Sequence, residues 1–69
     1  MSVSYKRLWK LLIDKEMSKS EMRASAGIAA STVSRMNKNE YISLEVLEKI
    51  CIALDCDFGD IIEIDKNQT

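Results

Sequence analysis

Apolar residues recur at the three- and four-residue spacing of amphipathic helices along most of the chain. Ser4 is placed to cap a first helix, which we expect to end near residues 15–17. Its buried stripe is predicted to contain Tyr5, Leu8, Trp9 and Leu12. Ser43 is placed to cap a later helix, which we expect to end near Asp55. The stripe of that helix is predicted to contain Leu44, Leu47, Ile50, Cys51 and Leu54.

Between these segments, residues 18–38 carry the signals of a short helix that is closed by a glycine. Ser18 and Glu21, three positions apart, are the two members of a capping box at the start of the helix. The helix is expected to end near Ala26, about two turns later. Gly27 then enters the left-handed region without a steric penalty and closes it.

A second helix, about residues 29–37, follows the glycine. Ile28 is an apolar plug between the two helices, and Val33 and Met36 continue the buried stripe. The polar residues of this helix fall on its other faces: Ser31, Thr32, Ser34 and Arg35. Two short helices joined in this way predict a helix-turn-helix, which makes double-stranded DNA the leading candidate partner.

The C-terminal segment is predicted to add one further turn and a strand. Asp57 can cap a turn that contains Phe58, Ile61 and Ile62, and residues 62–65 alternate as a strand does. The mate of this strand is either Val3 or the same strand of a second subunit, since a lone strand leaves its backbone groups unpaired. Residues 66–69 are expected to fray.

Three stretches of the motif carry a resemblance to a known family: Ser18-Lys19-Ser20-Glu21-Met22-Arg23, Gly27-Ile28-Ala29 and Thr32-Val33-Ser34. The chain resembles the Cro and CI repressor-like helix-turn-helix domains, the xenobiotic-response-element type, over nearly its whole length. The resemblance implies one domain over residues 1–69, with the motif at about 18–38. Its fold class would be all-α, a compact five-helix repressor-like domain, to which a short C-terminal strand can be added.

Two positions depart from the family pattern. Lys19 stands where the family commonly has a phosphate-contacting Gln, and it can still bind phosphate as a point charge. Arg23 stands where a small Ala usually lets the two motif helices approach closely. Its long side chain must either leave sideways or widen the helix crossing.

The charges of the chain are unevenly distributed, although the net charge is −1 over 69 residues. Residues 1–38 hold eight basic and three acidic side chains, a net charge of +5. Residues 39–69 hold two basic and eight acidic side chains, a net charge of −6. This layout would turn the basic half toward a phosphate backbone, unless both halves are simply solvated faces.

Few residues offer catalytic or metal-binding chemistry. The chain has no His, and Cys51 and Cys56 lack further thiols, so no zinc set, cofactor or metal site is predicted and both thiols are expected to be reduced. The carboxylates from Asp55 to Asp65 lack the spacing of a calcium loop. An enzyme is therefore the least favoured class. With no signal core and no membrane anchor, we expect a cytoplasmic protein.

The resemblance also implies roles on DNA, because the second motif helix of such domains enters the major groove with its N-terminal end. By motif position, the base-reading residues would be Ala30, Ser31, Ser34 and Arg35. Of these, Arg35 has a strong direct code, a bidentate pair with guanine. The phosphate-contacting residues would be Lys19, Ser20, Thr32, Lys38 and Asn39. Arg35 could instead be an ordinary exposed helix residue, and Ser31 and Thr32 merely polar residues of the first turn.

These observations predict a sequence-specific transcriptional regulator of a bacterium or phage, which binds a pseudo-palindromic operator as a homodimer. The dimer seam is expected in the C-terminal third, where apolar surface is supplied by Phe58, Ile61, Ile62 and Ile64. The alternative is a protein-interaction module or antitoxin-like partner that keeps the helix-turn-helix as a scaffold.

Overall fold

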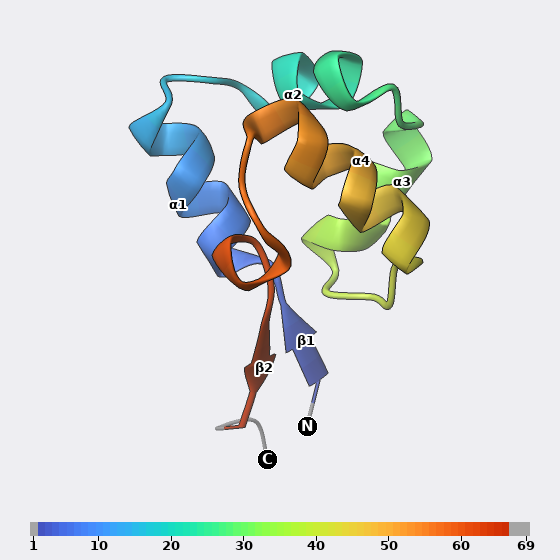
Figure 1. The fold of residues 1–69 in the computed structure, drawn as a ribbon. Helices are drawn as coiled ribbons and strands as arrows, with labels where there is room; N and C mark the ends of the chain where they lie inside the picture. The colour runs from blue at the N-terminus through green and yellow to red at the C-terminus, as the bar shows by residue number, and fades with distance from the viewer. Residues whose placement is uncertain (1, 67–69) are drawn as a thin grey trace.

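The computed structural model describes residues 2–66, which form four α-helices, one turn of 3-10 helix and a two-stranded sheet (Figure 1). The helices are α1 (Lys6–Asp14), α2 (Lys19–Ala26), α3 (Ala30–Asn37) and α4 (Leu44–Leu54). The 3-10 turn is η1 (Phe58–Asp60), and the strands are β1 (Ser2–Ser4) and β2 (Glu63–Asp65). Figure 1 shows the helices gathered around α4, with the two strands extending from them as a narrow ribbon. Residues 67–69, which were expected to fray, lie outside the described part of the chain.

The prediction of five helices is wrong: the described residues contain four α-helices, and the fifth element is the single turn η1. Asp57 caps this turn as predicted, with its carboxylate accepting the amide of Phe58 at 2.8 Å. The turn ends at Asp60, and the backbone then extends into β2. Antiparallel pairing of β2 with β1 competes with further helix, because the same backbone groups cannot serve both.

The tail strand pairs within the chain, which decides between the two mates considered above. Val3 lies opposite Ile64, and Ser4 lies opposite Glu63. This pairing also corrects the predicted cap of α1. Ser4 belongs to β1, so Tyr5 takes the N-cap position, although the Ser4 hydroxyl still accepts the amide of Lys6 at 3.3 Å.

The joint between α2 and α3 has the geometry that the sequence predicts. The Ser18 hydroxyl accepts the amide of Glu21 at 3.1 Å, and the Glu21 carboxylate accepts the amide of Ser18 at 3.0 Å. Gly27 has a φ of +69° and donates its amide to the carbonyl of Arg23 at 2.9 Å. The next amide, that of Ile28, also reaches Arg23, so the turn satisfies carbonyls that the helix end leaves open.

The core is built from every helix. Its fully buried side chains include Leu8 of α1, Met22 of α2, Met36 of α3 and Ile50 of α4. Ile61, directly after η1, is 0% exposed and completes this core. Phe58 and Ile62 are half-buried and pack against it. Much of the apolar surface that was expected to form a dimer seam is therefore used inside the monomer.

Candidate nucleic-acid interface

The N-terminal turns of α3 present a row of small side chains to solvent. Ala30 and Ser34 are exposed and lie four residues apart, so they share one face of the helix. Ser31 is also exposed and lies beside Ala30 on the first turn. Met36 is buried on the opposite face, and Val33, beside Ala30 at the edge of the row, is half-buried. The structure thus leaves three of the four predicted base-reading side chains on an accessible helix surface.

The fourth predicted base reader, Arg35, is exposed but bound to the loop after its own helix. Its Nε lies 3.2 Å from Oε1 of Glu40, and its Nη2 donates to the carbonyl of Tyr41 at 2.9 Å. The loop turns back toward α3 at Asn39, which has a φ of +57°. Arg35 would therefore have to exchange these partners before its Nε–Nη2 edge could contact a base.

The same loop is tied to the core by Tyr5. Its hydroxyl donates to the carbonyl of Glu40 at 2.6 Å, and the tyrosine is 1% exposed. Burial raises the pKa of the Tyr5 hydroxyl, while the backbone at Ile42 and the positive charge of Arg35 act in the opposite direction. The protonated hydroxyl is thus the favoured form and a stable donor to the loop.

The first turn of α2 lies beside α3 and offers free hydrogen-bond donors. The amides of Lys19 and Ser20 make no hydrogen bond with any described residue, as expected at a helix N-terminus. A hollow of about 130 Å³ separates this turn from α3, and it is lined by Lys19, Ser20, Arg23, Ala30 and Val33. The guanidinium of Arg23 donates to the carbonyl of Ile28 at 3.3 Å, so it braces the turn between the helices.

Two contacts to Lys19 were missed by the sequence reasoning. Its Nζ donates to Oδ1 of Asn37 at 2.7 Å and lies 4.2 Å from the centroid of the Trp9 ring. Trp9 was expected to be a core residue, and it does pack against the core, but its ring also carries the ammonium. The three residues come from three helices, so no local spacing in the sequence signals this cluster.

The remaining predicted phosphate contacts lie at both ends of the motif. Ser20 is exposed on the first turn of α2, and Lys38 and Asn39 are exposed just beyond α3. Thr32 is half-buried, which leaves it less accessible than Ser31 before it in the sequence.

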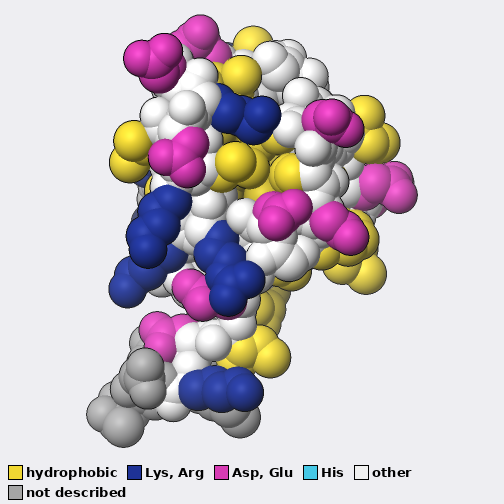
Figure 2. Space-filling model, turned by 60° about the vertical axis from the view of Figure 1, so that its left-hand side comes forward, with side chains coloured by type: hydrophobic (Ala, Val, Ile, Leu, Met, Phe, Trp, Pro, Cys, Tyr) yellow, Lys and Arg dark blue, Asp and Glu magenta, His cyan; other side chains and the backbone are white. Residues whose placement is uncertain are grey.

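The two oppositely charged halves of the sequence are in contact in the folded chain. Glu40 lies against Arg35, and Glu63 lies 3.5 Å from Nε of Arg7, so acidic residues of the second half pair with cations of the first. Figure 2, which turns the α1 side forward, shows basic and acidic side chains interspersed on that face. A simple division into a basic and an acidic face is therefore not what this view shows.

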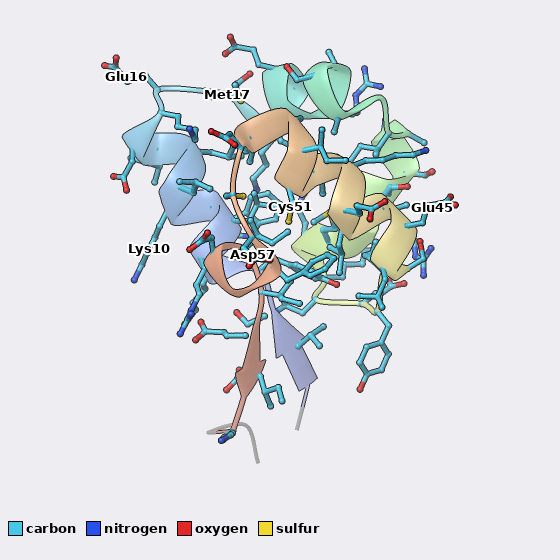
Figure 3. The ribbon with its side chains drawn as sticks, in the orientation of Figure 1. Lys10, Glu16, Met17, Glu45, Cys51 and Asp57 are labelled. Carbon is cyan, nitrogen blue, oxygen red and sulfur yellow. The ribbon has the colours of Figure 1, made fainter. Side chains whose placement is uncertain are left out.

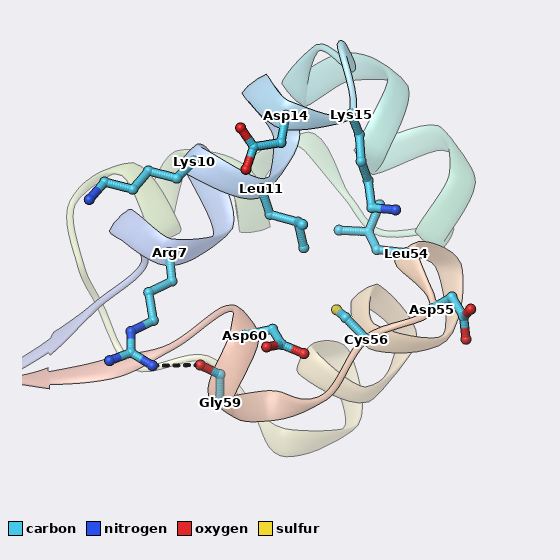
Figure 4. Close-up of a pocket in the computed structure, with 10 residues that line it drawn as sticks. All are labelled: Arg7, Lys10, Leu11, Asp14, Lys15, Leu54, Asp55, Cys56, Gly59 and Asp60. Carbon is cyan, nitrogen blue, oxygen red and sulfur yellow. Dashed lines mark hydrogen bonds between the residues drawn. The ribbon is translucent and has the colours of Figure 1, made fainter.

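A second and larger hollow, of about 490 Å³, lies between α1, the end of α4 and η1 (Figure 4). Arg7 spans one side of it and donates to the carbonyl of Gly59 at 2.8 Å. Its charged lining is balanced, with the basic side chains of Arg7, Lys10 and Lys15 and the acidic side chains of Asp14, Asp55 and Asp60. It therefore offers no net charge that would attract a phosphate.

The two cysteines are free thiols: Cys51 lies in the last turn of α4, and Cys56 follows two residues after the helix ends. Cys51 points inward, whereas Glu45 on the same helix points away from the core (Figure 3). Burial raises the pKa of the Cys51 thiol to about 11, and it also raises that of Cys56. Within residues 2–66, no three His, Cys, Asp or Glu side chains are grouped as metal ligands, and no helix is long and apolar enough to cross a membrane.

Comparison with known proteins assigns the chain to a family. A family model described as a Cro/C1-type helix-turn-helix DNA-binding domain matches residues 7–67. A crystal structure (form II) of the transcriptional regulator VanUg is 56% identical in sequence and superposes with a TM-score of 0.87. The match covers 90% of this chain and 83% of that one. Comparison with curated protein sequences finds no match. The chain belongs to the Cro/C1-type helix-turn-helix DNA-binding domain family.

Proposed function

We propose that the protein is a sequence-specific transcriptional regulator that places α3 in the major groove of double-stranded DNA. The observation that carries this proposal is the exposed row of Ala30, Ser31 and Ser34 on the first turns of α3, beside the free amides of α2. Family membership and the likeness to a transcriptional regulator support it.

Each predicted base reader has a distinct role in this proposal. The methyl group of Ala30 contacts a thymine methyl, and the hydroxyls of Ser31 and Ser34 donate to or accept from base edges. Arg35 pairs with a guanine once it has released Glu40 and the carbonyl of Tyr41. Because the other three side chains are small, Arg35 carries most of the sequence preference.

Phosphate oxygens on one side of the groove bind Lys19, Ser20 and the free amides of the first turn of α2. On the other side they bind Thr32, Lys38 and Asn39. These contacts set the position of α3 and supply most of the salt-dependent affinity. A regulator of this kind works in the cytoplasm of a bacterium, on chromosomal or phage DNA.

The proposed active form is a homodimer, since one α3 reaches only a few base pairs and two copies read half-sites about 34–36 Å apart. In the C-terminal third, the large apolar side chains left exposed are Ile52 at 73% and Ile64 at 59%. We place the dimer contact at these residues. Sedimentation of the parent, Ile52→Glu and Ile64→Glu with operator DNA tests it, and a monomer under all conditions would end the dimer proposal.

The DNA proposal is tested by a salt titration of binding to random-sequence duplex, measured by fluorescence anisotropy. The parent should bind with a steep negative slope of log affinity against log salt, and Lys19→Ala should reduce that slope by about 0.9. Lys10→Ala is the matched control, because Lys10 points outward from α1 on another part of the surface (Figure 3). Absence of binding at low salt would reject DNA as the partner.

A second candidate function is a protein-interaction module or antitoxin-like partner. It is favoured by an apolar patch of Tyr41 and Leu44, which are 73% and 67% exposed at the start of α4. Exposed apolar patches often mark protein contacts. If the parent fails to bind DNA, this patch is the first surface to examine for a protein partner.

A further inference from the structure

The ammonium group of Lys19 is held by two uncharged groups from other helices. The carbonyl oxygen of the Asn37 side chain accepts one of its protons at 2.7 Å, and the Trp9 ring centroid lies 4.2 Å away. Lys19 is the first residue of α2, Asn37 is the last of α3, and Trp9 lies within α1. The cluster therefore fixes one cation at a point where three helices meet.

The neutrality of these partners distinguishes Lys19 from Arg7 and Arg35, two arginines of the same half of the chain. Arg7 is paired with Glu63, and Arg35 is paired with Glu40. Among the described residues, Lys19 makes no ion pair. Its position is thus restrained while its full positive charge remains available to an external anion.

The restraint matters because a free lysine side chain loses much of its rotamer freedom when it binds an anion. The Trp9 face and Asn37 impose that loss in the folded protein, before any anion arrives. An ammonium group has three donors, and Asn37 uses one of them. The other two N–H groups can donate to an oxygen of a bound anion, and that oxygen can also accept hydrogen bonds from the free amides of Lys19 and Ser20.

We propose that Trp9 and Asn37 are positioning residues, which hold Lys19 ready for a DNA phosphate without neutralising it. This inference rests on the proposed function, since the anion is the phosphate backbone of duplex DNA. It adds two residues, neither predicted to touch DNA, that act on affinity through Lys19.

The test is a double-mutant cycle of Asn37 and Lys19 on binding to random-sequence duplex at fixed low salt. Asn37→Ala should weaken binding by about threefold to tenfold in the parent, from the rotamer freedom returned to Lys19. In the Lys19→Ala background the same change should alter binding by no more than about twofold. Asn37 is exposed, so its truncation leaves the core intact, which a thermal melt of each variant verifies.

A second pair of variants separates the aromatic face of Trp9 from its packing volume. Trp9→Phe keeps a ring beneath the ammonium and should retain more affinity than Trp9→Leu, which keeps apolar volume alone. In the Lys19→Ala background the two should bind equally. A loss of the same size in both backgrounds, for Asn37→Ala or for Trp9→Leu, would overturn the positioning role while DNA binding stands. A parent that does not bind DNA at all would overturn both proposals.

Discussion

Glu40 is predicted to compete with DNA for Arg35, and the Glu40→Gln variant measures that competition. Arg35 holds the Glu40 carboxylate at 3.2 Å and the Tyr41 carbonyl at 2.9 Å. A bidentate pair with guanine through the Nε–Nη2 edge needs the same two donors. Gln keeps an oxygen that accepts from Arg35 but removes the charge. The change therefore lowers the cost of releasing Arg35 while the loop keeps its other hydrogen bonds.

The size of the effect follows from how exposed this ion pair is. The side chains of Arg35 and Glu40 are 55% and 46% exposed, so solvent screens the pair strongly. Such pairs contribute about 0.2–1 kcal/mol, which corresponds to about a 1.4- to 5-fold change in an equilibrium constant at 25 °C. We expect Glu40→Gln to bind a selected operator more tightly by a factor in that range.

The assay is anisotropy with a labelled operator that contains guanine in each half-site, at one salt concentration. Glu48→Gln is the matched control, since it removes the same charge from an exposed position of α4. An equal gain in both variants would mean that net charge, not release of Arg35, sets the effect. A weaker complex for Glu40→Gln would show that the ion pair holds the loop in the bound form and would refute the competition.

Three further predictions concern stability. Gly27→Ala should lower the free energy of unfolding by about 1–2 kcal/mol in urea, because φ is +69° there while no atom lies within 4 Å of the added methyl. An unchanged urea midpoint would show that alanine adopts this backbone conformation without strain and would refute the prediction. Ser18→Ala should cost about 0.5–2 kcal/mol in the same assay through the lost cap. Burial raises the Cys51 pKa from 9.0 to about 11, so the folded protein holds this proton more tightly than the unfolded chain does. The resulting contribution to the free energy of unfolding is complete below pH 9.0 and is lost as the pH rises through about 11. Melts across that range should show a smaller alkaline loss in Cys51→Val, by about 1–3 kcal/mol.

The helix-turn-helix could be predicted from sequence because its geometry is decided by neighbours. The capping box involves Ser18 and Glu21, and Gly27 closes α2 through bonds to carbonyls three and four residues earlier. Local signals of this kind could not exclude the fifth helix, which the sequence predicts and the described residues 2–66 do not form. Whether the chain after Asp57 forms a helix or a strand depends on β1, at the other end of the sequence.

In the candidate site too, local features could be predicted from the sequence, whereas contacts between distant residues could not. Helical periodicity alone predicts that Ala30, Ser31 and Ser34 are exposed, and all three are exposed in the structure. The partners of Lys19 and Arg35 do not follow from periodicity. Lys19 reaches Asn37, which lies 18 residues away in the sequence, and Arg35 folds back onto a loop whose course is fixed by Tyr5.

Lys19 and Arg35 are held by different kinds of partner, and this difference predicts the order in which they contact DNA. Lys19 is restrained by neutral groups, so it meets a phosphate with its charge intact and with little left to reorganise. Arg35 is restrained by a carboxylate and a carbonyl, so it meets a base after giving up both. Lys19 can then contact the DNA phosphate backbone on any sequence. The free-energy cost of releasing Arg35 is offset only where a guanine replaces Glu40 and the Tyr41 carbonyl. On this account the Arg35–Glu40 pair is broken on the operator, where a guanine replaces it, and is kept on random DNA. The Glu40→Gln variant should therefore gain more affinity on the operator than on random DNA. An equal gain on both would mean that the Glu40 carboxylate acts by repelling the phosphate backbone. Measuring both DNAs separates the two effects of one carboxylate.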